Sequence, residues 1–198
     1  YFRFGAGSTH LLGGSTTISG TFTPPSSTFR FGGGGGRLTV NSVLADGASA
    51  RAVEMSGTEI LYGTVSLVAL TQANTYTGPT TVRKGALRLA GTGGSALNTS
   101  AFNVRSTSAL DVLPNAFLQL DAGLAHAGWE NETGAVVGNN NNRVVDTTPV
   151  NLYSGTMHFF GNPDTGTTET IGPLNAQSGL ASLDARWKAG ATGTTIQY

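Results

Sequence analysis

The sequence contains no cysteine, so no disulfide bond can hold this chain together. Small secreted domains often depend on disulfides, and this fold must instead be held by packing and backbone hydrogen bonds. Charged residues are also scarce, at 11%, and the formal net charge is +0. Proteins that bind nucleic acids usually cluster Lys and Arg, so we expect no nucleic-acid partner.

No apolar run in the sequence is long enough to cross a bilayer, and no signal peptide is visible. We therefore expect no membrane insertion by this segment. The chain begins with Tyr1 rather than Met and ends at Tyr198, so we expect it to be part of a longer or processed protein. We interpret residues 1–198 as a single segment of one fold.

Glycine is abundant, with 29 residues, whereas Glu and Lys, which favour helices, are few. Ser, Thr and Asn, which suit turns, are common. Hydrophobic residues make up 38%, and 198 residues are enough to bury a substantial core. This composition predicts an all-β fold with short strands and many turns.

A short unit recurs along the chain: a small residue, any residue, an apolar residue, any residue and a second apolar residue. Apolar residues two apart lie on the same face of a strand, so each unit buries one face. The unit occupies residues 36–40, 85–89, 108–112 and 155–159, and it returns in weaker form at 183–185.

The spacing of these units is the main evidence for a repeat fold. With Val65 and Leu67 counted as a further apolar pair, the first apolar positions are 38, 65, 87 and 110, at steps of 27, 22 and 23 residues. The later step, from 157 to 183, is 26 residues. Such steps are in the range of solenoid repeats, in which each unit stacks on its neighbour. We predict a β-solenoid with repeat-like units near 28–91 and 141–185, and further strands at Phe102/Val104 and Leu118/Leu120.

A β-sandwich is the competing architecture, because it also contains many short strands separated by turn residues. It does not predict a recurring unit at near-regular spacing, so we favour the solenoid.

A second internal match supports duplication. Residues 1–9, YFRFGAGST, match residues 28–36, TFRFGGGGG, in which a Phe-Arg-Phe strand runs into glycines. The run from Gly32 to Gly36 lacks the Lys-Ser/Thr of a phosphate-binding loop, and no helix is predicted after it. We therefore interpret it as a turn.

The stretch LTQANTYTGPTTVRKGALRL, residues 70–89, resembles the autotransporter-associated β-strand repeat of bacterial autotransporter passenger regions and related surface proteins. Family members usually have Gly or Ala in place of Pro79, and a small or Asn-Gly turn in place of Arg83-Lys84. Residues 28–47, 141–162 and 167–185 resemble segments that flank this repeat. The resemblance implies a right-handed parallel β-helix exported to the cell surface. The residues that form the structural repeat motif are Asn74, Thr75, Tyr76, Thr77, Gly78, Thr80, Thr81, Val82, Gly85, Leu87 and Leu89.

The chemistry of this motif suits strands and corners. Its Thr and Val residues are β-branched and fit a half-buried pleated surface. We expect the Tyr76 ring to pack on the core with its hydroxyl at the edge. We expect Gly78-Pro79 to form a corner and Arg83-Lys84-Gly85 to form a solvated turn.

Residues that could carry chemistry are isolated. His10, His126 and His158 have no metal-site or catalytic-triad spacing, and His158 is predicted to point outward from a strand. A polysaccharide-cleaving β-helix needs clustered carboxylates, and Asp111, Asp121 and Arg105 could meet in space. Trp129 and Trp187 could be sugar platforms, although core packing is the default. The remaining scattered carboxylates are interpreted as solvating outer faces: Glu130, Glu132, Asp146, Asp164 and Glu169.

We therefore expect no enzymatic activity, metal or cofactor. The sequence favours a structural or adhesive fibre protein at an extracellular or bacterial outer surface. It is expected to self-associate through its ends or lateral faces and to bind a surface glycan or protein. The alternatives are a polysaccharide-acting enzyme and a passive spacer that aids export. An ice-binding face would need a regular Thr-x-Thr array, which the irregular Thr spacing does not provide.

Overall fold

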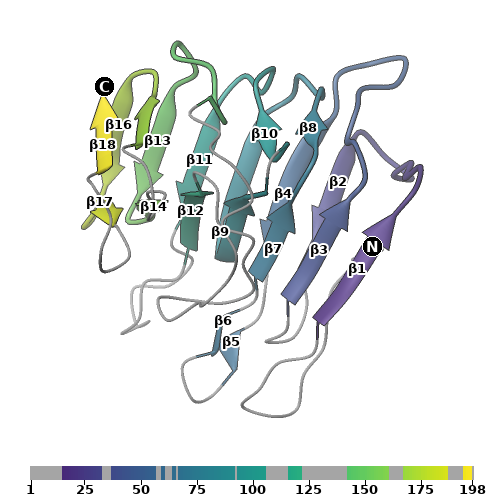
Figure 1. Ribbon diagram of the computed structural model, residues 1–198, viewed down its shortest axis with the longest axis horizontal. Helices are drawn as coiled ribbons and strands as arrows, with labels where there is room; N and C mark the ends of the chain where they lie inside the picture. The colour runs from purple at the N-terminus through teal and green to yellow at the C-terminus, as the bar shows by residue number, and fades with distance from the viewer. Residues whose placement is uncertain are drawn as a thin grey trace.

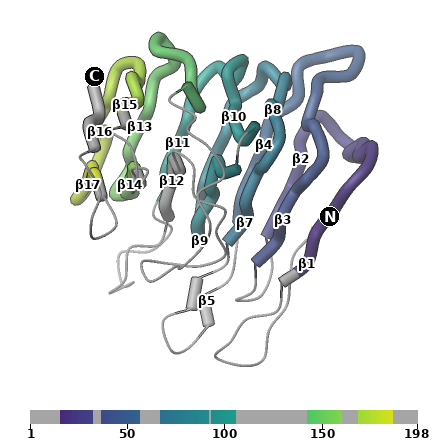
Figure 2. Tube along the Cα trace, in the orientation of Figure 1, coloured from purple at the N-terminus to yellow at the C-terminus, as the bar shows by residue number. Residues whose placement is uncertain are grey.

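The computed structural model is all-β in the part of the chain that it describes (Figure 1). It contains no helix in this part, and thus none that is long and apolar enough to span a bilayer. Figure 2 shows the strands following one another along the long axis from the N- to the C-terminus. The described residues are 15–32, 37–56, 59–60, 64–65, 67–91, 93–105, 116–121, 142–160, 167–186 and 194–197.

Two long series of parallel strands run along the molecule, and we name them ladder A and ladder B. Ladder A pairs its strands in the order in which they follow in sequence, with β9 sharing its first half. It consists of β2 (Thr28–Phe31), β4 (Ala52–Ser56), β9 (Thr80–Leu89), β11 (Phe102–Arg105), β13 (Val150–Tyr153) and β16 (Leu174–Ser178).

Ladder B is also parallel throughout and takes the second half of β9. Its other strands are β1 (Ser15–Ser19), β3 (Arg37–Asn41), β7 (Leu67–Leu70), β12 (Ala116–Asp121), β14 (Thr156–Phe160) and β17 (Ser182–Arg186).

Three shorter pairs complete the strand pairing of the described residues. The parallel pairs are β8 (Ala73–Asn74) with β10 (Ser95–Ala96), and β15 (Thr167–Thr170) with β18 (Thr194–Gln197). The pair β5 (Glu59–Ile60) with β6 (Thr64–Val65) is antiparallel.

Strand β9 joins the two ladders because it bends between them. Gly85 adopts a φ of 86°, a left-handed conformation that glycine reaches without a Cβ clash. The residues Thr80–Val82 pair in ladder A, and Gly85–Leu89 pair in ladder B. The chain thus changes direction where the solvated turn Arg83-Lys84-Gly85 was expected, and Arg83 is exposed. The expectation of a break between two strands is wrong, because these residues lie inside a continuous ten-residue strand.

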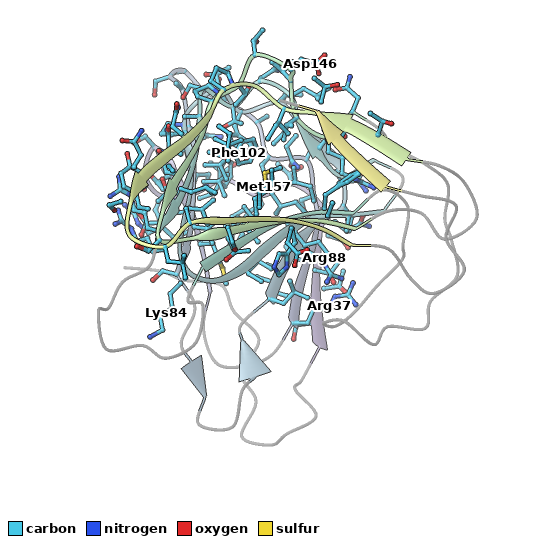
Figure 3. The ribbon with its side chains drawn as sticks, turned by 90° about the vertical axis from the view of Figure 1, so that its left-hand side faces the viewer. Arg37, Lys84, Arg88, Phe102, Asp146 and Met157 are labelled. Atoms are coloured by element: carbon cyan, nitrogen blue, oxygen red, sulfur yellow. The ribbon has the colours of Figure 1, made fainter. Side chains whose placement is uncertain are left out.

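The core lies between the layers of the two ladders. In Figure 3, Phe102 and Met157 point into this interior, whereas Arg37 and Arg88 lie outside it. One continuous apolar cluster takes inward residues from both ladders and from the segments that connect ladder B back to ladder A. The connecting segments contribute Leu44, Tyr76, Ala96, Val144 and Ile171.

The recurring units fall largely where the sequence predicts. Leu87 pairs with Val68 on one side and Leu118 on the other, and Met157 pairs with Leu118 and Leu183, so these positions share one register along ladder B. Val68, Leu87 and Met157 are buried in the core, and Leu183 packs against it. The predicted strands at Phe102/Val104 and Leu118/Leu120 are confirmed as β11 and β12. The unit at residues 108–112 and the match at residues 1–9 lie outside the described residues.

One register prediction is wrong. Val68 and Leu70, not Val65 and Leu67, occupy the inward row next to Leu87 and Leu89. Leu67 instead lies on the outer face, where it packs in a separate small cluster with Ala86. A shift of one residue moves every side chain of a strand to the opposite face, so the error follows from the strand's period of two.

The parallel pairing also decides against the β-sandwich, because sandwiches are built from antiparallel sheets. The element that begins after the run from Gly32 to Gly36 is strand β3 and not a helix, as predicted. Residues 33–36 of that run lie outside the described part.

Candidate functional site

The residues of the predicted repeat motif lie where neighbouring segments of the stack meet, and Asn74 is the clearest case. Its side chain is buried, with 3% exposure. The Leu44 N–H donates to Asn74 Oδ1 at 2.9 Å from a segment 30 residues earlier. Asn74 Nδ2 donates to the Ser95 carbonyl at 2.9 Å, 21 residues later, and to the Gln72 carbonyl at 2.8 Å. This one side chain therefore links its own segment to a segment on each side.

A second part of the motif is a chain of buried, hydrogen-bonded hydroxyl groups next to the Gly78-Pro79 corner. Tyr76 is fully buried, and its hydroxyl lies 2.6 Å from Thr80 Oγ1. Thr80 Oγ1 lies 2.9 Å from Thr99 Oγ1, which donates to the Gly78 carbonyl at 2.8 Å. Burial raises the pKa of Tyr76 well above its usual value. The prediction that the Tyr76 hydroxyl would lie at the edge is wrong, because Thr80 and Thr99 give it polar partners inside the core.

The outer part of the motif is anchored by Asp46. The Thr77 N–H and hydroxyl both donate to this carboxylate, at 3.1 and 2.7 Å, and the Arg51 N–H donates at 2.7 Å. The Thr77 hydroxyl, followed by the Arg51 N–H, lowers the pKa of Asp46. The Thr75 side chain is exposed, and only its N–H bonds inward, to the Leu44 carbonyl.

Gly78-Pro79 forms the predicted corner at the entry to ladder A. The Gly78 N–H donates to the Arg51 carbonyl, and the Pro79 carbonyl accepts from the Val53 N–H. A similar contact recurs before β13 and β16. There the carbonyls of Pro149 and Pro173 accept hydrogen bonds from the first N–H group of β11 and of β13, respectively. Sequence reasoning missed these two corners, although Thr148-Pro149 and Gly172-Pro173 precede their strands as Gly78-Pro79 precedes β9.

The rest of the motif is divided between core and surface. Val82, Leu87 and Leu89 are buried in the core, and Thr81 lies on the outer face of ladder A. The motif therefore works as a connector that holds one layer of the stack to the next.

Arg143 and Glu169 form a buried polar pair that the sequence did not predict. Both residues are 0% exposed. Glu169 Oε1 accepts from the N–H groups of Arg143 and Val144, at 2.8 and 3.0 Å. The Arg143 guanidinium donates to the Gly94 carbonyl at 2.5 Å and the Gly91 carbonyl at 2.7 Å. The interpretation of Glu169 as a surface carboxylate is thus wrong: it is buried, and its carboxylate accepts from two backbone N–H groups of a neighbouring turn.

The environment of Glu169 makes stability depend on pH. Burial raises the pKa of Glu169 from 4.5 to about 7, with a smaller upward effect from Asp146. The N–H groups of Val144 and Arg143 and the Arg143 charge act in the opposite direction. Between these two pKa values the folded chain binds the proton more tightly than the unfolded chain. The free energy of unfolding therefore falls as pH rises through this window.

We expect a loss on the order of 2 kcal/mol between about pH 4.5 and about pH 8, measured by urea unfolding. Glu169→Gln keeps the Oε1 acceptor and removes the titration, so it should flatten this dependence. Asp146→Asn, at an exposed position of the same turn, should leave most of it. An unchanged pH dependence in Glu169→Gln would show that another group is responsible.

The outer faces of the two ladders differ in burial. In the middle of ladder B the outward residues Ala69, Arg88 and His158 are buried, with exposures of 0%, 3% and 3%, whereas Thr39 and Asp184 nearer the ends of the same row are half-buried. His158 does point outward from its strand, as predicted, and its Nε2 lies 4.0 Å from Asp184 Oδ2. This distance is too long for a direct hydrogen bond.

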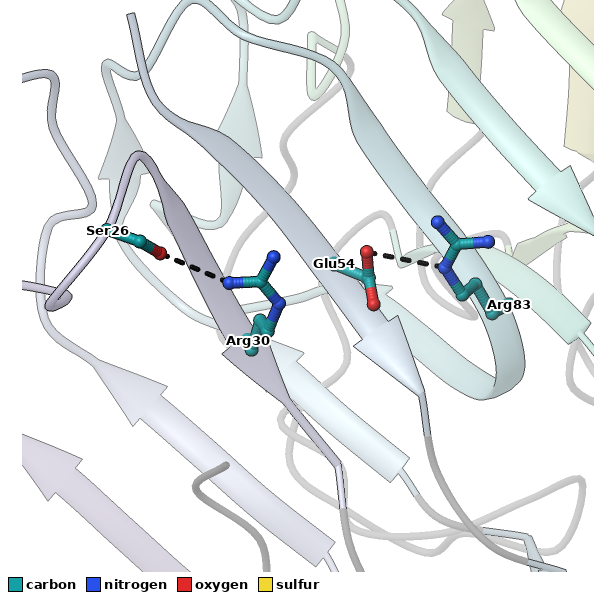
Figure 4. A network of polar contacts seen from close by, with 4 residues as sticks. All are labelled: Ser26, Arg30, Glu54 and Arg83. Atoms are coloured by element: carbon teal, nitrogen blue, oxygen red, sulfur yellow. Dashed lines mark hydrogen bonds and ion pairs between the residues drawn. The ribbon is translucent and has the colours of Figure 1, made fainter. Parts of the chain in front are cut away.

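On ladder A the matching outward residues are half-buried and polar, and we call them the polar row. Figure 4 shows its N-terminal end, where Arg30 donates to Ser26 Oγ at 3.1 Å and Glu54 pairs with Arg83 at 3.3 Å. The polar row consists of Arg30, Glu54, Thr81, Asn103, Asn151 and Asn175.

Two more of the residues considered for catalysis or binding lie in the described part of the chain. The Arg105 guanidinium carbon lies 4.2 Å from the centroid of the Tyr153 ring, on which it stacks. Asp146 is exposed and lies at the top of the molecule in Figure 3. Among the described residues, no group of three or more His, Cys, Asp or Glu side chains could hold a metal ion. Outside the described side chains lie His10, Asp111, Asp121, His126, Trp129, Glu130, Glu132, Asp164 and Trp187.

Comparison with protein-family models, curated proteins and solved structures finds no match to this chain. The resemblance of residues 70–89 to the autotransporter-associated repeat therefore stays a prediction.

Proposed function

We propose that the chain forms a right-handed parallel β-helix and serves as a structural and adhesive, non-enzymatic element of an extracellular or bacterial surface protein. The order of the elements supports the helical path. The chain passes from a ladder A strand to a ladder B strand, then through a short third segment, and returns to ladder A. Around β9 the third segments are β8 and β10, which pair with each other. Crossovers between parallel strands are almost always right-handed.

The observation that carries the structural role is the form of the C-terminal end of the stack. Within the described residues, β16 and β17 each pair with one other strand, β13 and β14. Ala176 and Ala185, which continue the inward rows, are exposed, and Leu180 is 89% exposed. A strand edge with free backbone groups is a template for pairing with another chain.

The N-terminal end offers a surface of similar character. Ile18 of β1 is half-buried, and the half-buried ring of Phe22 lies 5.7 Å from the ring of Phe29. A second copy added head to tail would keep all strands parallel and would cover both apolar ends. We therefore propose assembly into filaments by end-to-end stacking.

This assembly is tested by concentrating the purified protein and examining it by analytical ultracentrifugation and electron microscopy. We expect fibres whose amount rises with protein concentration. The double variant Ala176→Lys/Ala185→Lys places charges at the C-terminal end and should abolish them with unchanged thermal stability. Asn98→Lys, at an exposed turn, is the matched control and should still form fibres. A monodisperse wild-type monomer at high concentration would contradict the filament proposal.

The surface role is supported by the low share of charged residues, 11%, and the absence of cysteine, together with the connector role of the repeat motif. Its test is deletion of the segment that encodes residues 1–198 from the gene in its own cell, followed by measurement of surface display of the remaining protein and of adhesion. Loss of adhesion with display retained supports an adhesive role. Retained display and adhesion would indicate a passive spacer, and loss of display would indicate a segment that aids export.

A further inference from the structure

The outer face of ladder A has the properties of a binding surface, unlike the outer face of ladder B. Every member of the polar row is half-buried and reaches solvent, whereas Ala69, Arg88 and His158 in the middle of the corresponding row of ladder B are covered. A flat face that is polar and accessible over several adjacent strands is therefore available on one side of the molecule.

Three asparagines form the C-terminal half of the polar row. Asn151 Nδ2 donates to Asn103 Oδ1 at 3.0 Å, and Asn175 Nδ2 donates to Asn151 Oδ1 at 2.9 Å. A carboxamide has two N–H donors and two acceptor lone pairs, so each of these side chains keeps hydrogen-bonding capacity beyond the row. The mutual bonds fix the orientation of the amides, which gives a regular array of donors and acceptors spaced by about 4.8 Å, the distance between strands.

An aromatic ring lies beside this array. Tyr153 is half-buried and follows Asn151 by two residues in β13, on the same face. The Arg105 guanidinium stacks on the ring at 4.2 Å and holds it in place. The residue paired with Tyr153 on the other side is Ser178, a short and exposed side chain. The ring therefore has room on its C-terminal side.

The charges near the array indicate the chemistry of the partner. The two charged members of the polar row lie at its N-terminal end, where Glu54 is paired with Arg83 at 3.3 Å and Arg30 donates to Ser26 Oγ at 3.1 Å. Thr81 and the three asparagines are uncharged, and the cation of Arg105 is stacked on the Tyr153 ring. A nucleic acid or an acidic polymer would need clustered unpaired cations. Neutral amides with an aromatic platform instead suit a ligand with many hydroxyl groups and apolar ring faces.

We propose that the outer face of ladder A binds a neutral polysaccharide chain that lies across the strands. The amides of Asn103, Asn151 and Asn175 hydrogen-bond successive sugar hydroxyls, and the Tyr153 ring packs against one sugar face. The repeat of the strands gives a regular binding surface for a polymer that is itself regular. The inference rests on the adhesive role proposed above and names the class of its partner.

The test is depletion of the purified protein by insoluble neutral polysaccharides of β-linked glucose, β-linked N-acetylglucosamine and mannose. We expect binding to at least one of them, and at least tenfold weaker binding by Asn151→Ala and by Tyr153→Ala. Tyr153→Phe keeps the ring and Asn98→Ala removes an exposed asparagine elsewhere, so both should bind as the wild type does. Thermal unfolding of each variant confirms that the fold is retained.

The proposal is overturned if the wild type binds none of these polymers. It is also overturned if Asn151→Ala and Tyr153→Ala bind as tightly as Asn98→Ala. Filament formation is measured without any polysaccharide, so failure of this inference and failure of end-to-end assembly are distinguishable.

Discussion

Replacing Asn74 by alanine is expected to lower the free energy of unfolding by about 4 kcal/mol. Asn74 Oδ1 is the acceptor for the buried Leu44 N–H, and Asn74 Nδ2 is the donor to the buried Ser95 carbonyl. Alanine leaves both groups unsatisfied, and each such group costs about 1–3 kcal/mol. The two groups belong to different segments of the stack, so the substitution weakens contacts on both sides at once.

Urea unfolding followed by circular dichroism measures this loss. Thr75→Ala is the matched control, because it removes an exposed side chain from the adjacent position and leaves the Thr75 backbone bond intact. We expect it to change stability by less than about 0.5 kcal/mol. If Asn74→Ala costs no more than Thr75→Ala, the side chain does not join neighbouring segments.

Replacing Gly78 by alanine should cost about 3 kcal/mol, at the upper end of the range for overpacking. A Cβ at Gly78 would lie 2.5 Å from the Arg51 carbonyl oxygen and 2.9 Å from the Ala52 nitrogen. These are backbone atoms of the neighbouring segment, which cannot move without disturbing β4. The Gly78 N–H bond to the Arg51 carbonyl would be strained by the same displacement.

Gly47→Ala is the control for this prediction. Its Cβ would also meet an atom at 2.5 Å, but that atom is Arg51 Nη2, the far end of a flexible side chain. The guanidinium can move aside, so the expected cost is less than about 1 kcal/mol. Thermal denaturation of both variants compares them, and equal costs would show that the corner at Gly78 is not tightly packed.

The sequence predicts the fold class and most of the inward-facing positions better than it predicts the register of individual strands. The alternation at Leu38/Val40, Leu87/Leu89 and Met157/Phe159 identifies inward rows because polar residues separate the apolar ones. At residues 67–70, LVAL, the alternation is lost because both faces of β7 are buried. Periodicity cannot tell the inner from the outer face of such a strand. This is why Val65 and Leu67 were wrongly predicted to be the inward-facing pair.

Buried polar contacts were the other part that could not be predicted. Glu169 has no local pattern that separates it from a surface carboxylate, since its partners Arg143 and Val144 lie on a segment 26 and 25 residues earlier. The hydroxyl chain of Tyr76, Thr80 and Thr99 likewise depends on three-dimensional proximity. By contrast, the corner at Gly78-Pro79 follows from local backbone chemistry and was predicted correctly.

The central claim is that successive strands stack in parallel and in register, and thiol cross-linking tests it directly in a chain that has no native cysteine. Asn103 and Asn151 pair in adjacent strands, and Asn103 and Asn175 lie two strands apart. Adjacent strands are about 4.8 Å apart, within the Cα separation of about 4.4–6.8 Å that a disulfide spans. Two strand spacings, about 9.6 Å, exceed it. Mild oxidation should therefore close a disulfide in Asn103→Cys/Asn151→Cys and not in Asn103→Cys/Asn175→Cys, as seen by intact mass and gel mobility. Equal oxidation of the two variants, or oxidation of the second alone, would contradict the stacked register.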